Sequence, residues 1–276
     1  MLPMLTCLLC VTLLISALPM QAVGGDPLAH ADALVQSASS PNTDRLPHPP
    51  KGYRWQLIES LSDEFAGDTL DATKWIPYHP YWRGRNSRHE EFNVSVKDGN
   101  LRLKSSLRTG AEEVKASTVT AACVTSKQRN CAPGYYEARI KASDLSMTSA
   151  FWFQGKYSEI DVIENIGNAS EPNSVWIYQT MMTNTHYFKG GWDQDRKTPF
   201  NWKMPKPSSA DYHVYGVWWK DADTVAFYHN GTMIKDVTTG GPFDEKQYMF
   251  FDTEVFTWHG WPTQASLLDP NRNTML

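Results

Sequence analysis

The sequence has no surplus of basic residues. It carries 26 Lys and Arg against 30 Asp and Glu, which gives a formal net charge of −4. Nucleic-acid binding relies on a basic surplus that neutralises phosphates. The charge balance therefore excludes a generic nucleic-acid-binding protein, and we expect no nucleic-acid partner.

Long hydrophobic runs are also scarce. Residues 5–18 are almost wholly apolar and are followed by small residues, but no other stretch approaches the roughly 18 residues of a membrane-spanning helix. This is the pattern of a secretory signal peptide, although no Lys or Arg precedes it. We expect a signal peptide over residues 1–24, a secreted or periplasmic protein and no membrane span. Lipid anchoring at Cys10 is less favoured, because Leu9 stands where a small residue is expected.

Cysteine is the third scarcity. The chain has 4, and two of them leave with the signal peptide, so that Cys123 and Cys131 remain on either side of a short polar stretch. In an oxidising compartment these two are expected to form a disulfide, and two free thiols are the alternative. Too few further ligands lie near them for a metal site, and we predict none.

Aromatic residues, by contrast, are abundant. The 11 Trp, 12 Tyr and 11 Phe make up 12% of the chain. Such a content suits a sandwich core, a groove that stacks on the apolar faces of sugars, or both.

The chain divides into a linker and one folded domain. Residues 25–51 are rich in Ala, Ser and Pro and are typical of a flexible linker. From residue 52 onward, many short segments alternate with period two and are separated by turn signals such as Asn230-Gly231. The pattern predicts an all-β sandwich of jelly-roll type over residues 52–276.

One segment carries a candidate catalytic centre. Glu159, Asp161 and Glu164 stand among Ile and Val in what otherwise reads as a buried strand. In a regular strand Glu164 would point away from the other two acids, whereas a β-bulge at residues 162–163 would return it to their face. Crowded carboxyl groups suppress each other's ionisation, so one can stay protonated beside a charged neighbour. Retaining glycoside hydrolysis needs such a pair.

A solvated strand face or a calcium site are the alternatives for these acids. The flanking Ile160, Val162 and Ile163 favour burial, and residues 151–153 (Phe-Trp-Phe) lie just upstream. We therefore favour a catalytic role.

The domain resembles glycoside hydrolase family 16, in the subgroup that includes laminarinases, carrageenases, agarases and porphyranases. The similarity covers nearly all of residues 52–276. Its motifs are Asp63-Glu64-Phe65, Gly134-Tyr135-Tyr136-Glu137 and the full run Glu159-Ile160-Asp161-Val162-Ile163-Glu164.

The resemblance implies a concanavalin-like jelly roll with a concave substrate groove. It also implies Glu159 as the nucleophile, Glu164 as the acid/base, and Asp161 as the residue that orients Glu159. Substrate-binding candidates are Trp82 and Trp152 for stacking, His186 and Glu254 for hydrogen bonds to sugar hydroxyls, and Arg83 and Arg85 for charge.

Within the family, the segments around residues 142–149 and 251–256 look most like β-porphyranases, which are endohydrolases of β-1,4 bonds in sulfated red-algal galactan. Arg83 and Arg85 give independent support, since guanidinium groups suit sulfate oxygens as they suit phosphate. A neighbouring Arg88 is as well explained by a solvated loop balanced by Glu90 and Glu91. β-Agarase activity on neutral agarose, or an inactive carbohydrate-binding protein on the same fold, are the alternatives.

The expected partner is therefore an algal galactan polysaccharide bound by a monomer. No cofactor is expected, although the family leaves room for a structural calcium ion. Family members also usually continue beyond the segment resembling residues 273–276, so we expect the domain to lack a final C-terminal strand.

Overall fold

The structure is a computed structural model that describes residues 46–276. The signal peptide and most of the linker lie outside the described residues. Ordered contacts begin before residue 52, because Leu46 packs against the same buried cluster as Trp55, and the Trp55 indole nitrogen donates a hydrogen bond to the Pro47 carbonyl at 2.6 Å. No helix among the described residues is long and apolar enough to cross a membrane.

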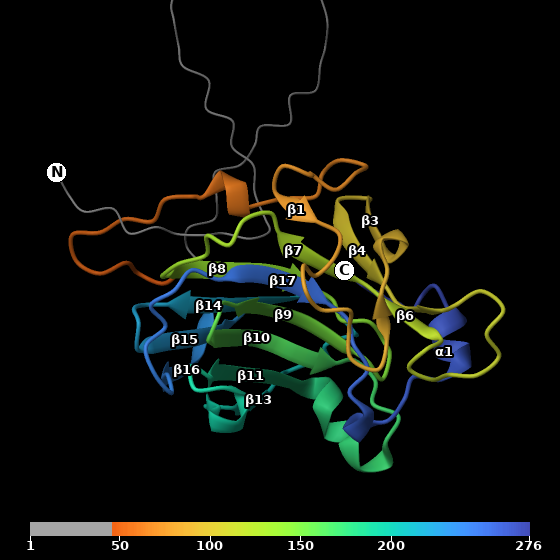
Figure 1. Cartoon of the computed structure of the whole chain (residues 1–276). Helices are drawn as coiled ribbons and strands as arrows, with labels where there is room; N and C mark the ends of the chain where they lie inside the picture. Colours follow the sequence, from red (N-terminus) through yellow and green to blue (C-terminus); the bar gives the residue numbers. More distant parts are fainter. Residues whose placement is uncertain (1–45) are drawn as a thin grey trace, which may run out of the picture.

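The larger sheet carries the catalytic candidates. Its strands pair in the order β1-β7-β17-β9-β10-β11-β12, and β13 pairs with the far end of β11; Figure 1 shows β7, β17, β9, β10 and β11 side by side in this order. The bounds are β1 (Trp75–Ile76), β7 (Cys123–Ser126), β17 (Tyr248–Asp252), β9 (Thr148–Gln154), β10 (Ser158–Ile166), β11 (Thr180–Tyr187), β12 (Arg196–Lys197) and β13 (Phe200–Lys203).

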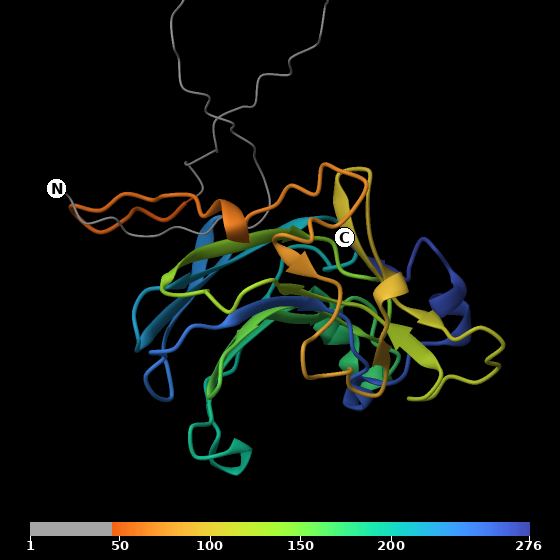
Figure 2. The same ribbon diagram turned by 45° about the horizontal axis from the view of Figure 1, so that its top comes forward.

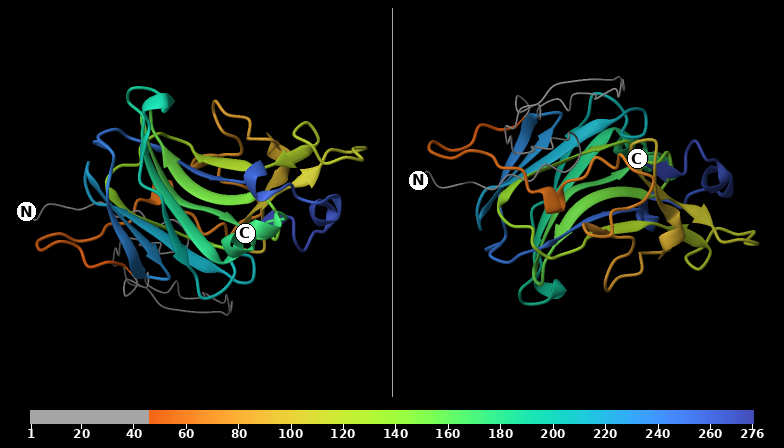
Figure 3. Two further views of the ribbon diagram at one scale, coloured as in Figure 1. Left: turned by 90° about the horizontal axis from the view of Figure 1, so that it is seen from below. Right: turned by 90° about the horizontal axis from the view of Figure 1, so that it is seen from above.

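A second layer lies behind this sheet (Figure 3). It contains β16 (Thr232–Thr238), β15 (Thr224–His229), β14 (His213–Trp219) and β8 (Gly134–Ile140), together with β18 (Thr274–Met275), β4 (Asn100–Lys104) and β3 (Val94–Lys97). Leu276 and Lys141 exchange both backbone hydrogen bonds, at 2.8 and 3.0 Å, and so join the two groups of strands.

The remaining elements are short. A small sheet at one end holds β2 (Arg88–His89), β6 (Val119–Ala121) and β5 (Ser106–Leu107). The helices are η2 (Glu59–Leu61), η3 (Glu91–Asn93), η4 (Pro172–Gln179), η5 (Trp192–Gln194), η6 (Thr257–His259) and α1 (Gln264–Leu268).

The core follows from period-two alternation. Phe151, Phe153, Ile160 and Phe251 alternate with groove-facing residues on β9, β10 and β17, and all four are at least 97% buried. Burial of such a side chain contributes about 1.5–3 kcal/mol before conformational entropy is subtracted. The predicted all-β sandwich is confirmed.

The Asn230-Gly231 hairpin is also confirmed. These residues connect β15 to β16 with φ values of 48° and 79°. A type I′ turn needs positive φ at both central positions, which Asn and Gly tolerate best.

The predicted disulfide is wrong: Cys123 and Cys131 are both buried free thiols. Cys123 pairs with Asp252 on β17, whereas Cys131 pairs with Gln247, five residues earlier on the same neighbouring segment. At 3.3 Å per residue the two cysteines are about 16 Å apart. A disulfide needs Cα atoms about 4.4–6.8 Å apart.

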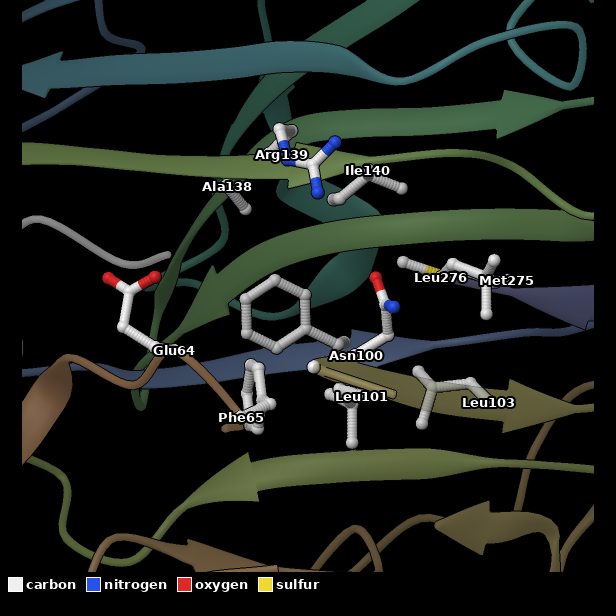
Figure 4. Close-up of a pocket in the computed structure, with 12 residues that line it drawn as sticks. Glu64, Phe65, Asn100, Leu101, Leu103, Ala138, Arg139, Ile140, Met275 and Leu276 are labelled. Carbon is white, nitrogen blue, oxygen red and sulfur yellow. The ribbon is translucent and has the colours of Figure 1, made fainter. Parts of the chain in front are cut away.

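A small apolar cavity lies between the layers. Its volume is about 60 Å³, and it opens to the surface beside the exposed residues Gly99 and Arg139. Figure 4 shows Phe65, Leu101 and Leu103 turned toward it, with Ala138 and Ile140 of β8 along the opposite side.

Candidate active site

The predicted bulge is present in β10 and brings the three acids to one face. The pairing between β10 and β9 shifts register between Asp161 and Ile163. Glu159 then lies opposite Gln154, Asp161 opposite Trp152, and Glu164 opposite Ala150. Because residues 150, 152 and 154 alternate along β9, they share a face, and so do the acids opposite them.

Rows of side chains run across the sheet on this face. One row is Tyr248, Gln154, Glu159 and His186, on β17, β9, β10 and β11. The next row is Phe250, Trp152, Asp161 and Asn184. The sequence thus places aromatic, amide and acidic groups side by side without any loop contributing.

The central members of these rows, Trp152, Gln154, Glu159 and Asp161, line an open groove of about 580 Å³. Ligand sites commonly measure about 300–1,000 Å³. The lining residues are His79, Tyr81, Trp82, Arg85, Thr148, Ala150, Trp152, Gln154, Glu159, Asp161, Glu164, Trp192, Asp252, Glu254 and Phe256.

Burial and mutual repulsion raise the pKa values of the acids. Desolvation is the main cause for each: it raises the pKa of Asp161 to about 8 and that of Glu164 to about 8. The pKa of Glu159 is also raised well above its usual value, first by desolvation and then by the Asp161 charge. The cluster therefore retains protons near neutral pH.

Two neighbours counteract this effect at Glu159. The Gln154 side-chain amide donates a hydrogen bond to Glu159, and both this bond and the nearby His186 lower the pKa of Glu159. These contacts favour the ionised form of Glu159, but desolvation and the Asp161 charge still hold its pKa well above the usual value, so the three acids together keep protons that can be redistributed among them. A charged and a protonated carboxyl group on one face suit nucleophilic attack and acid catalysis.

His186 is fixed at both ring nitrogens. The amide nitrogen of Asn184 lies 2.8 Å from Nε2, and the Asp195 carboxylate lies 2.6 Å from Nδ1. Nε2 also faces Asp161 Oδ2 at 3.4 Å and Glu159 Oε1 at 4.0 Å.

Trp82, Arg85 and Glu254 form one rim of the groove. Glu254 Oε1 accepts hydrogen bonds from the Trp82 indole nitrogen at 2.5 Å and from the Arg85 backbone nitrogen at 2.8 Å. One oxygen of Glu254 thus anchors the loop that carries two predicted substrate-binding residues.

Trp152 lies on the groove floor. It stacks on Phe250 with ring centroids 4.4 Å apart, and its indole nitrogen donates to Asp252 at 3.3 Å. His79 stacks on the same Phe250 and accepts from the backbone nitrogen of Trp82 at 3.1 Å.

The predicted arginines separate in the structure. Arg85 lines the groove and Arg83 does not. Arg88 pairs with Glu90 at 3.2 Å, as expected for a solvated loop.

Several residues in the groove or beside it were missed by sequence reasoning. Gln154 and Asp252 could have been found by following the alternation along β9 and β17. Trp192 and Asp195 lie in or just after η5, where no periodicity signals a site. They were not predictable from the sequence pattern.

Two groupings among residues 46–276 have metal-ligand atom types within 4.8 Å of one another. One is His89, Cys123 and Asp252, and the other is Glu159, Asp161 and His186. The second coincides with the acid cluster. Neither is the all-oxygen set that calcium prefers, so the structural calcium ion stays a prediction.

The chain is similar to known carbohydrate-active proteins. Residues 55–276 match the family model described as "Beta-porphyranase A-D, GH16 domain". β-Porphyranase E of Zobellia galactanivorans is 36% identical over 250 residues, which cover 82% of this chain and 86% of the relative. β-Agarase AgaB34 of Agarivorans albus is 30% identical over 286 residues, covering 90% and 61% of the two chains.

A solved structure has the same fold as this chain. The crystal structure of a β-porphyranase from the human gut bacterium Bacteroides plebeius matches with a TM-score of 0.72 and 31% identity, covering 84% of this chain and 92% of that one. Its fold confirms the jelly-roll topology expected from the sequence.

Proposed function

This chain belongs to the GH16 β-porphyranase family, and from that premise we propose that it is a retaining endohydrolase of β-1,4 galactosidic bonds in porphyran. The observation that carries the mechanism is the bulged strand β10, which presents Glu159, Asp161 and Glu164 on one face of the groove.

In this proposal Glu159 attacks the anomeric carbon while Glu164 donates its proton to the leaving oxygen. A galactosyl ester forms on Glu159, and Glu164, now ionised, takes a proton from water that cleaves the ester. The raised pKa of Glu164, about 8, supports its role as the acid, because it remains protonated near neutral pH.

Arg85 supports recognition of a sulfated sugar. Its exposed guanidinium lies over the Phe256 ring at 5.4 Å and the Trp258 ring at 5.6 Å, and Phe256 itself lines the groove. Stacking fixes the plane of the guanidinium, and its N–H groups then suit two sulfate oxygens. Arg83, outside the groove lining, is assigned no such contact.

The test is release of reducing ends from porphyran and from agarose by the wild-type chain and two variants. We expect wild type to act on porphyran and Glu159→Gln to lose at least about 10³-fold in kcat. Arg85→Gln should raise KM for porphyran roughly 10- to 100-fold, the value of a charged hydrogen bond.

Arg88→Gln is the matched control, because Arg88 pairs with Glu90 and does not line the groove. Preference of the wild-type chain for agarose would contradict the proposal that Arg85 binds a sulfate group of the substrate. Release from neither polysaccharide would favour a carbohydrate-binding protein without activity.

A further inference from the structure

The loop after β11 holds an acid that no motif points to. Asp195 lies directly after η5, on the segment that projects below the sheets in Figure 2. Its side chain is only 14% exposed, and Oδ2 lies 2.6 Å from His186 Nδ1. The other oxygen, Oδ1, is buried without a hydrogen-bond partner.

The loop is fastened in this position. Trp192 stacks on Phe188 with ring centroids 3.8 Å apart and meets the His186 ring edge-on at 5.9 Å. Backbone bonds join Gly191 to Phe188 at 2.8 Å and Gln194 to Gly191 at 3.0 Å. Asp195 is thus delivered to His186 by a packed turn.

The hydrogen bonds of His186 determine which ring nitrogen carries the proton. The Asn184 amide is oriented by its oxygen, which accepts from the Thr185 backbone at 3.0 Å, so its nitrogen donates to His186 Nε2. The ring proton therefore lies on Nδ1 and is donated to Asp195. This leaves Nε2 facing Asp161 Oδ2, a buried oxygen that has no hydrogen-bond partner of its own.

We propose that Asp195 is a positioning residue that holds His186 so that Nε2 can take up the proton shared by Glu159 and Asp161, leaving Glu159 ionised for attack. This inference rests on the proposed hydrolase function. In the transfer, the O–H bond of Asp161 breaks and an N–H bond forms at Nε2, while Asn184 releases its hydrogen bond. The imidazolium then lies between two carboxylates, and the buried charge of Asp195 is compensated.

The charged groups around His186 agree with this role. Glu159 and Asp161 face it from β10, Asp195 faces it from the loop, and Lys197 lies opposite it in the β12 register. His186 lowers the pKa values of both Glu159 and Glu164. Loss of His186 as a proton acceptor would leave the proton with the two carboxyl groups and keep Glu159 protonated to higher pH.

The test is the pH dependence of kcat/KM on porphyran for the full chain and Asp195→Asn. We expect the acidic limb of Asp195→Asn to move upward by about one pH unit, equivalent to about tenfold lower kcat/KM on that limb. Asp195→Glu should restore most of the wild-type profile. Asp193→Asn, the same change at an exposed position of the same loop, should leave the profile unchanged.

A profile of Asp195→Asn that superimposes on wild type, or that is lowered equally at every pH, would overturn the proposal. A second comparison separates this role from misfolding. In a His186→Gln background, Asp195→Asn should have no further effect on the pH profile. An added shift would contradict the proposal that Asp195 acts through His186. Failure of the function itself looks different, since wild type would then release no more reducing ends than Glu159→Gln.

Discussion

The two faces of β17 and its neighbours line two pockets that differ in size and in polarity. Phe251 points to the apolar cavity between the layers, whereas the next residue, Asp252, points into the groove. The cavity has a volume of about 60 Å³ and the groove one of about 580 Å³. The cavity is lined largely by aliphatic and aromatic side chains, and the groove gathers five acids with raised pKa values.

The difference indicates a packing role for the cavity and a catalytic role for the groove. An apolar cavity that holds at most a few water molecules is a packing feature, and its lining contributes to stability. In the large groove, desolvated acids lie close enough to repel each other electrostatically, an arrangement that a well-packed core avoids. Such an arrangement is typical of a catalytic site. Substitutions should therefore affect activity at one face and stability at the other.

The largest effect is expected for Glu164→Gln at the groove. Loss of the general acid should lower kcat on the polysaccharide by about 10²–10⁴-fold. Reducing-end assays at the pH optimum measure this, with circular dichroism to verify the fold. A variant with more than half of wild-type activity would contradict the role of Glu164.

Leu103→Ala tests the other hollow. Leu103 is 1% exposed and lines the cavity, so its truncation should lower the free energy of unfolding by about 2–5 kcal/mol. Urea unfolding gives this value, and kcat/KM at low temperature should stay within about twofold of wild type. A lower kcat/KM without a lower free energy of unfolding would contradict the assignment of stability to the cavity face and activity to the groove face.

A smaller effect concerns the stability cost of the groove. The folded chain holds the Glu164 proton up to about pH 8, whereas the unfolded chain releases it near pH 4.5, so wild-type stability falls as pH rises between these values. Glu164→Gln removes this loss. We expect it to be more stable than wild type at pH 9, by at most about 5 kcal/mol, and equally stable at pH 4, as measured by chemical unfolding. Equal stability at both pH values would contradict the raised pKa.

The smallest effect concerns the two thiols. Cys123 lies beside His89 and Asp252, and Cys131 lies within the main core, so reductant has no disulfide to cleave. Dithiothreitol should change Tm by less than about 1 °C. A fall of several degrees, as expected for loss of 2–4 kcal/mol, would indicate a disulfide.

Local patterns in the sequence predicted much of the fold and the acid cluster. Alternation predicted the strands, Asn230-Gly231 predicted a hairpin, and the spacing of Glu159, Asp161 and Glu164 predicted the bulge. Each of these depends on neighbours in the chain.

Non-local pairing limited the rest. The cysteines looked close because only seven residues separate them, but they align with different ends of the β17 segment. Asp195 became visible as a partner of His186 only once the turn around Trp192 was in place. The selection of Arg85 over Arg83 likewise depends on how Glu254, 169 residues away from Arg85, anchors the loop.

The most direct test of the central claim is the anomeric form of the first product, followed by proton NMR during porphyran hydrolysis. Attack by Glu159 followed by water inverts the anomeric carbon twice, so the account predicts that the β-anomer appears first and later mutarotates. Initial appearance of the α-anomer would contradict Glu159 as the nucleophile.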